Sequence, residues 1–437
     1  MCRRAPGPAS WATATRAGPH RSARLRRSVS NHPAVASRQP GWRRHRAAIS
    51  VIFLLVGIML GTWFTRIPQL RTDLGLDYGS LGVVLLAQTV GVIIAMQVAG
   101  HLATHLDSRS VIRSTAPLLP WFLPLVAMMP GAVPAGLGML GWGMVAGLLD
   151  VAMNAQGVEL ERIGRRPVLS SLHAVWGVGA LLGSLGTVVA GRAGWSLGTH
   201  FVVVAIALTT LAVAGGRHLH ATVNGGAPDT RQRTRMGIFA GWTRAIVVLG
   251  ALGAAVALCE GAVSSWSGVF LRDQRGAATN IASLAYFAFI VAQTGTRMVG
   301  DRVLRRFGAV ALVRLSMVVT AAGVLLAVSI PNAWSGIAGF AMQGCGLAVA
   351  IPIIASAVGH GSTSSTSLAI ARYSTLHQAG VLAGPPLLGW LAQAFGVGTA
   401  LTLLVVPLGI IAVLAVATAP ATSRPHPEVA AAAEPRT

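Results

Sequence analysis

The chain has 437 residues, of which 53% are hydrophobic and 11% are charged, and its mean hydropathy is +0.65. Soluble globular proteins carry about twice this share of charged residues, so the composition excludes an ordinary soluble domain. Apolar stretches of about 18 or more residues recur along the sequence, and each can cross a hydrocarbon layer about 30 Å thick. A backbone in lipid must satisfy its own hydrogen bonds, so continuous runs of this length predict helices.

The net charge of +22 does not indicate a nucleic-acid partner, because the arginines fall in the N-terminal tail and in short segments between apolar runs. Cys2, Cys259 and Cys345 are far apart, so neither a disulfide framework nor a metal site is expected. The sequence contains no Walker loop, HExxH motif or nucleophile elbow. We therefore expect no cofactor, no metal and no enzymatic activity, and no ATP-driven pump within this chain.

Residues 1–46 are rich in Arg, Ser, Pro and Ala, contain no acidic residue and show no apolar period. This composition is typical of a disordered cytoplasmic tail. Two alternatives stay open, a start codon assigned too early and an organelle-type transit peptide, so the sequence does not settle whether this segment is translated.

The remaining chain predicts an all-α integral membrane protein with twelve spans in two halves of six. The spans are 47–65, 81–104, 111–129, 134–156, 169–190, 199–216, 245–269, 281–299, 310–330, 334–357, 368–391 and 399–417. The predicted organisation is a tail (1–46), an N-terminal half (47–216), a cytoplasmic linker (217–244), a C-terminal half (245–417) and a disordered C-terminal tail (418–437).

Arginine placement predicts the orientation. The segments on the side of the N-terminal tail carry Arg109, Arg113, Arg162, Arg165, Arg166, Arg217, Arg231, Arg233, Arg235, Arg244, Arg302, Arg305 and Arg306. The opposite side carries Arg66, Arg71, Arg192, Arg272 and Arg275. This asymmetry predicts a plasma-membrane protein with both termini in the cytoplasm.

The span at 134–156 carries the most informative pattern. Gly143, Gly147, Asp150, Asn154, Gly157 and Glu161 recur at intervals of three or four residues and therefore share one helix face. Asp150 lies eleven residues before Glu161, about 16 Å along the helix axis and near the middle of the membrane. A carboxyl group at that depth must face water, a partner or a proton. Asp150 is either a proton- or solute-binding acid, with Asn154 beside it, or a hydrogen-bonded group that pins this helix to a neighbour.

Four further polar residues lie within predicted spans. Glu260 is placed about three turns from the outer end of its span, where a structural role and a pathway role are equally open. Arg372 needs an acidic or carbonyl partner, and Asp150 and Glu260 are both candidates. His173 and Trp176 share a face of the fifth span, either as packing residues or as part of the solute pathway.

The fifth and eleventh spans share a glycine rhythm. Its members are Gly179, Gly183 and Gly186 in the first half and Gly380, Gly384 and Gly389 in the second. Small residues four positions apart allow helix backbones to approach closely. Their occurrence at matching places in two halves favours an internal duplication.

The segment from Gly295 to Gly308, with Asp301, Arg302, Arg305 and Arg306, resembles the cytoplasmic loop signature of the major facilitator superfamily. The resemblance implies a twelve-helix secondary transporter in which these residues form a cytoplasmic latch. The matching first-half segment has Thr104 where the acid of that signature is expected.

A narrower resemblance is to permeases of the fucose-permease type and related sugar permeases. It rests on Trp63–Gln69, Asp150–Asn154, Ser171–Trp176 and Gly384–Gly389. It implies that Asp150 is the coupling carboxylate, with Asn154 beside it. The second acid of that group is missing near Phe64.

We therefore expect a secondary transporter, monomeric in the bilayer, that moves a sugar or related small metabolite by alternating access, with H+ as the candidate coupling ion. The pathway candidates are Asp150, Asn154, His173, Trp176, Glu260 and Arg372. The alternatives are a drug or metabolite efflux permease and, with less support, a membrane receptor that transports nothing. The direction of transport, the coupling ion and the identity of the solute stay open.

Overall fold

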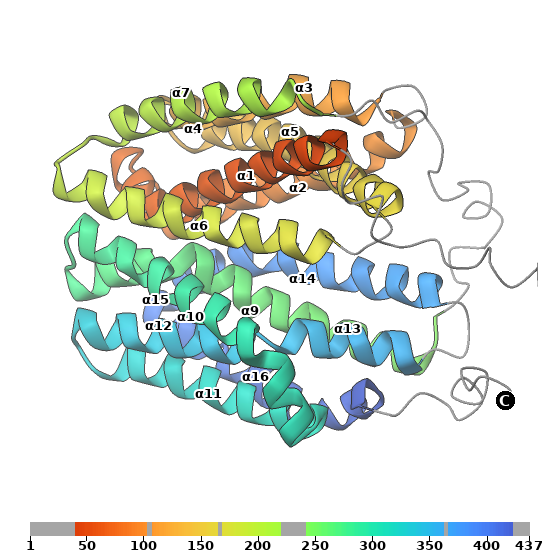
Figure 1. Ribbon diagram of the computed structural model, residues 1–437. Coiled ribbons are helices and arrows are strands. Elements are labelled where there is room, and N and C mark those ends of the chain that lie inside the picture. The colour runs from red at the N-terminus through yellow and green to blue at the C-terminus, as the bar shows by residue number, and fades with distance from the viewer. Residues whose placement is uncertain (1–39, 103–106, 165–167, 220–241, 362–365, 423–437) are drawn as a thin grey trace, which may run out of the picture.

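The computed structural model describes residues 40–102, 107–164, 168–219, 242–361 and 366–422, and the regular elements in these ranges are all helices. The N-terminal half contains α1 (Pro40–Asp73), α2 (Tyr78–Leu102), α3 (Ser108–Leu118), η2 (Leu119–Trp121), α4 (Phe122–Ala127), α5 (Ala132–Gly164), α6 (Leu169–Arg192) and α7 (Leu197–Gly216). The C-terminal half contains α9 (Arg244–Arg275), α10 (Thr279–Phe307), α11 (Ala309–Ser329), α12 (Ala333–Leu347), α13 (Ala350–Gly361), α14 (Thr366–Phe395), α15 (Val397–Thr402), α16 (Val405–Leu414) and η3 (Ala415–Thr422). The helices run side by side, with the red-to-green N-terminal half above the green-to-blue C-terminal half (Figure 1).

Ten segments of the described chain are long and apolar enough to cross a membrane. Helices α10 and α14 coincide with the predicted eighth and eleventh spans but do not belong to this group. Both pack along neighbours of the same half, α10 against α12 and α14 against α9. The multi-pass helical fold is confirmed, and the total of twelve spans is consistent with the helix order.

The ends of the chain differ from the predicted boundaries. Helix α1 begins at Pro40 rather than at residue 47, because Trp42 is buried and its Nε1 donates to the Leu160 carbonyl of α5 at 3.2 Å. At the other end η3 continues to Thr422, five residues past the predicted last span. Residues 1–39 and most of the predicted linker lie outside the described residues, so the predictions for them are not tested.

Several helices continue beyond the apolar windows that identified them. Helix α9 begins after Thr243, whose side chain accepts a hydrogen bond from the Ile246 amide at 3.2 Å. It ends at Gly276, where a φ of 59° favours glycine. The helix is therefore 32 residues long, or about 48 Å, whereas its predicted span covered 245–269. Polar residues at helix ends lie beyond the hydrocarbon layer, so hydropathy does not mark where a helix stops.

Glycines bring helix backbones together at equivalent places in the two halves. A Cβ at Gly179 or Gly183 of α6 would overlap backbone carbonyls of α1, at Leu54 and Ile58. A Cβ at Gly380 of α14 would overlap the backbone of α9. The glycine rhythm thus serves close packing, of α6 on α1 and of α14 on α9, which agrees with the predicted repeat. Gly186 has nothing within 4 Å and takes no part in this packing.

The predicted tenth span is not one continuous helix. It is divided into α12 and α13 by a turn at Ala348 and Val349, and both residues are buried. The carbonyl of Ala348 accepts a hydrogen bond from Arg297 Nε of α10 at 3.3 Å. A broken helix inside a bundle leaves backbone groups that a side chain can satisfy, and such breaks are common where transporters bind solutes.

Candidate functional site

Contacts between the two halves gather at one end of the bundle. This contact end holds the turns between α1 and α2 and between α9 and α10. Arg71 at the end of α1 forms an ion pair of 2.5 Å with Asp273 at the end of α9. The Oε1 atom of Gln393 on α14 accepts from the Tyr78 amide of α2 at 3.1 Å, and Ser283 Oγ of α10 donates to the Thr65 carbonyl of α1 at 3.3 Å.

Aromatic and glycine contacts strengthen the same end. The rings of Phe64 (α1) and Tyr286 (α10) have centroids 5.1 Å apart, and those of Tyr78 and Trp266 are 6.1 Å apart. Gly389 of α14 lies against the backbone of Tyr78 and Gly82 in α2. Helices α1 and α2 are therefore held against α9, α10 and α14 at the contact end.

The opposite end carries most of the basic residues. We call it the arginine end, because α10 finishes there with Arg302, Arg305 and Arg306, all three exposed. These residues lie within the last turns of the helix, which ends at Phe307, and not in a loop as predicted. The side chain of Asp301 lies outside the described residues, and the proposed latch is therefore not tested. Asp107 in the first half caps α3 by accepting from the Arg109 amide at 3.3 Å.

Asp150 is exposed, although it lies in the middle of α5. Asn154, one turn further along α5, donates from Nδ2 to the Asp150 carboxylate at 3.2 Å and to the Asp150 carbonyl at 2.9 Å. The glycines before it on the stripe, Gly143 and Gly147, pack against α2. The predicted stripe therefore has two uses: Gly143 and Gly147 hold α5 to α2, and Asp150 stays accessible.

His173 of α6 is brought toward this acid. It is exposed and interacts electrostatically with Asp150, and its ring meets Phe53 of α1 edge to face at 5.2 Å. Trp176 is half-buried one turn later, and its carbonyl lies where a Cβ on Gly57 would fall. The predicted N-terminal candidates therefore come together as a group of Asp150, Asn154 and His173, and Trp176 helps α6 pack on α1.

Glu260 lies at the centre of α9, fifteen residues or about 22 Å from the helix end at Arg275. Its distance from the helix end is greater than the three turns predicted to the end of the span, because α9 continues to Arg275. Its carboxylate accepts from Gln293 Nε2 at 2.9 Å and faces Arg297 Nη2 at 3.7 Å. Both partners lie on α10, so a charged group joins α9 and α10 halfway through the bundle.

Arg372 is not the partner of Glu260. Its guanidinium lies over the ring of Trp242 at 5.4 Å, while the ion pair of Glu260 in the described part of the chain is with Arg297. The reason is depth along the bundle. Tyr373, the next residue of α14, packs against Gly253 of α9, two helical turns or about 10 Å from Glu260.

Arg297 is the functional candidate that sequence reasoning missed. It lies two residues from the end of the predicted span at 299, where an arginine belongs to the basic end of a helix. In the structure α10 continues to Phe307, which places Arg297 ten residues, or about 15 Å, inside the helix. The signal in the sequence is the charge of Arg297 itself, one turn after Gln293 on the same helix face.

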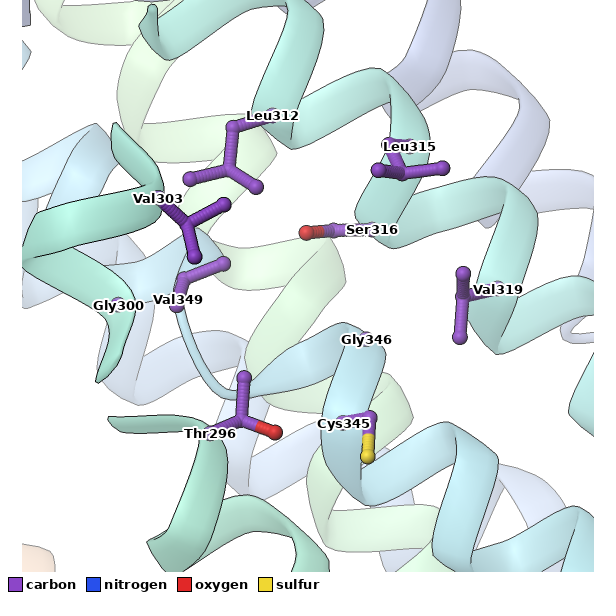
Figure 2. A pocket seen from close by; sticks show the side chains of 10 residues that line it. All are labelled: Thr296, Gly300, Val303, Leu312, Leu315, Ser316, Val319, Cys345, Gly346 and Val349. Atoms are coloured by element: carbon purple, nitrogen blue, oxygen red, sulfur yellow. The ribbon is translucent and has the colours of Figure 1, made fainter. Parts of the chain in front are cut away.

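A pocket of about 150 Å³ lies elsewhere, between α10, α11 and α12. Thr296, Ser316 and Cys345 are its polar side chains among otherwise aliphatic walls (Figure 2). All of its lining residues belong to the C-terminal half. Its walls carry no charged residue, so it does not match the chemistry of the two charged groups.

Comparison with known proteins supports the assignment of the fold. The sequence profile of the Major Facilitator Superfamily matches residues 249–437. An uncharacterized transporter of Sinorhizobium fredii is 30% identical over 361 residues, which cover 81% of this chain and 91% of that one. An uncharacterized MFS-type transporter of Yersinia pestis is 29% identical over 355 residues, 81% of this chain and 90% of the relative. Membrane protein MosC of Rhizobium meliloti is 28% identical over 372 residues, 85% and 89% of the two chains.

Solved structures share the fold at low sequence identity. A mutant of the nucleoside transporter NupG superposes with a TM-score of 0.68 at 15% identity, covering 86% of this chain and all of that one. A bacterial homologue of the human lysosomal transporter Spinster, in an inward-facing and occupied conformation, gives 0.66 at 12% identity, covering 86% and 97%. The finer likeness to sugar permeases stays a prediction. The sequence relatives and the fold together establish that this chain belongs to the Major Facilitator Superfamily of membrane transporters, which are not enzymes.

Proposed function

We propose that this secondary transporter moves a sugar or a related small hydroxylated metabolite together with H+. The observation that carries the proposal is the exposed carboxylate of Asp150 in the middle of α5, beside Asn154 and His173. An ionisable group is costly at that depth unless water, a proton or a solute meets it. An amide and an imidazole next to it supply the hydrogen-bond donors and acceptors that hydroxyl groups need.

Alternating access explains why the halves touch at the contact end. The ion pair between Arg71 and Asp273 closes that end, while the exposed Asp150 and His173 lie further toward the arginine end. Arginine placement assigns the arginine end to the cytoplasm. This arrangement corresponds to a state that opens inward, and rocking of the two halves would open the contact end in turn.

Removal of the Asp150 charge tests the proposal. Purified protein in liposomes loaded with a pH-sensitive dye is given a panel of labelled hexoses under an inward proton gradient. We expect Asp150→Asn to abolish proton-linked uptake while expression and thermal stability stay unchanged, because the amide cannot carry the proton. The matched control is Glu159→Gln on the same helix, whose exposed pair with Arg162 at 2.7 Å contributes little. Full coupled transport by Asp150→Asn would remove this residue from the mechanism.

A further inference from the structure

The guanidinium of Arg297 donates few hydrogen bonds for a charged group inside a membrane bundle. Its side chain is 42% exposed, and its Nε donates to the Ala348 carbonyl. Its Nη2 lies 3.7 Å from the Glu260 carboxylate, which is too far for a hydrogen bond. Within the described residues neither terminal nitrogen donates a hydrogen bond, so the outer fork of the guanidinium is available.

The surrounding chain fixes Arg297 in this position. The break between α12 and α13 provides the Ala348 carbonyl, and Val349 beside it packs against Gly300 of α10. The Glu260 carboxylate is held on its other side by Gln293 at 2.9 Å. A pre-oriented guanidinium with a free fork is suited to a planar carboxylate, which it binds through two parallel hydrogen bonds.

Arg297 also lies beside the interface between the halves. Thr294 of α10 lies against Gly177 of α6, with 4.0 Å between the Thr294 hydroxyl and a Cβ built on Gly177. The two helices run in opposite directions. Arg297 is therefore about 4.5 Å from this contact toward the arginine end, and His173 is about 6 Å from it in the same direction. The arginine of one half and the histidine of the other lie at the same depth.

From this arrangement we propose that Arg297 binds an anionic group, a carboxylate, on the transported solute, and that Glu260 takes up a proton when the solute displaces it. The inference rests on the proposed transport function and narrows its substrate class to carboxylated metabolites such as sugar acids. His173 and Asn154 would meet the remainder of the solute from the N-terminal half. Charge is balanced at both groups. The solute carboxylate takes the place of Glu260 beside Arg297, and one proton neutralises the Glu260 carboxylate that has lost its cationic partner. The proton and the anion therefore travel together.

The groups around Glu260 support this exchange. Oε2 of Glu260 is buried and makes no hydrogen bond to the described residues, so it can carry the proton. The buried Tyr286 lies close enough to interact with it electrostatically. On α14, Tyr373 packs against Gly253 of α9 about two turns away, and its ring centroid is 5.9 Å from that of His377. Within the described residues, Arg297 is the cation that forms an ion pair with the acid.

Matched pairs of probes test the inference on the purified full-length protein. D-galactose is compared with D-galacturonate, and D-glucose with D-glucuronate, by thermal shift and by proton uptake into dye-loaded liposomes. We expect the uronates to bind better than the neutral sugars. Arg297→Gln should remove this preference, with a loss of about tenfold or more in uronate affinity and little change for the neutral sugars. Arg297→Lys, which keeps the charge without the fork, should lose less.

Two variants sharpen the result. Arg314→Gln is the control, because Arg314 of α11 is exposed and also donates through Nε to a backbone carbonyl, that of Ala412, at 3.2 Å. It should keep the uronate preference. Glu260→Gln imitates the protonated acid and should bind uronates at least as tightly as the native protein, but without the additional proton that Glu260 takes up when a uronate binds.

The outcomes distinguish a failure of this inference from a failure of the proposed transport function. Transport of neutral sugars with no preference for uronates overturns anion recognition and leaves the proposed function intact. Native uronate affinity in Arg297→Gln overturns it as well. If no probe of either kind binds or moves, the proposed substrate class fails, and the inference fails with it.

Discussion

The two halves share a helical arrangement, but they differ in which charged residue is the less exposed, the arginine or the acid. In the N-terminal half Arg66 is sealed in the core at 1% exposure and donates from Nε to His200 Nδ1 at 3.1 Å, whereas the acid, Asp150, is exposed. In the C-terminal half the arginine, Arg297, is 42% exposed and the acid, Glu260, is held against α10 at 26%.

This difference shows that an arginine inside a helix of the bundle is not by itself a functional signal. Arg66 holds α1 to α7 through His200 and also donates to Gln69 of its own helix. Arg297 also has unused donors, but it is exposed and lies beside the interface between the halves. Because Arg66 Nη2 likewise makes no hydrogen bond within the described residues, what separates the two roles is burial: Arg66 is closed off in the core and Arg297 is accessible.

The largest expected effect is on the sealed arginine. We expect Arg66→Ala to lower the free energy of unfolding by about 3–4 kcal/mol, because it leaves a cavity and removes the donor of His200. Arg297→Ala should cost about 1 kcal/mol or less, because its pair with Glu260 is loose and exposed. Denaturation in detergent micelles measures both. An equal loss in the two variants would contradict the contrast between the halves.

Glycine packing, by contrast, should be equally demanding in the two halves. We expect Gly183→Ala and Gly380→Ala each to cost about 3 kcal/mol, because the new Cβ would overlap backbone of the neighbouring helix, which cannot move aside as a side chain can. Gly186→Ala, which has nothing within 4 Å, is the control and should be neutral or slightly stabilising. The readout is thermal unfolding. A tolerated Gly380→Ala would argue against equivalent packing.

The contact end and the arginine end can be compared through their ion pairs. We expect Asp273→Asn to weaken the closure by about 1 kcal/mol, roughly a fivefold change in the population that opens at this end. The measurement is maleimide labelling of Ser283→Cys, a buried position, in a background without Cys2, Cys259 and Cys345. Glu159→Gln at the arginine end should leave labelling unchanged, and faster labelling in this control would show general loosening.

The smallest expected effect is at the start of α2. Asp77 accepts from the Ser80 amide at 2.6 Å, and this hydrogen bond holds the pKa of the Asp77 carboxyl below its ordinary value near 3.8. Its contribution to stability is therefore present above that value and is lost as the pH falls through the lowered pKa. We expect Asp77→Ala to cost about 0.5–1 kcal/mol at pH 7 and progressively less as the pH falls through the lowered pKa. A loss that does not depend on pH would exclude the charged cap as its cause.

The depth of a residue in the bundle could be predicted from the sequence where the helical periodicity was strong. It could not be predicted where a helix continues beyond the apolar stretch that identified it. Asp150 and Asn154 were placed together correctly, because both lie on one helix one turn apart. Arg297 was missed, and the distance of Glu260 from its helix end was not predictable, because α9 and α10 continue well past their hydrophobic stretches. The motif around Trp63 and Arg66 carries core residues, with Trp63 edge to face on Trp142 at 5.2 Å.

The sequence by itself determined that this chain is a multi-pass helical membrane protein, because apolar length and arginine asymmetry are properties of consecutive residues. It also determined that helices pack through glycines and that Asp150 and Asn154 lie together on one helix face. Only the tertiary structure decided which charges meet. The pairing of Glu260 with Arg297, the support from the Ala348 carbonyl and the sealing of Arg66 depend on distances between separate helices. The period of a single helix contains no information about those distances.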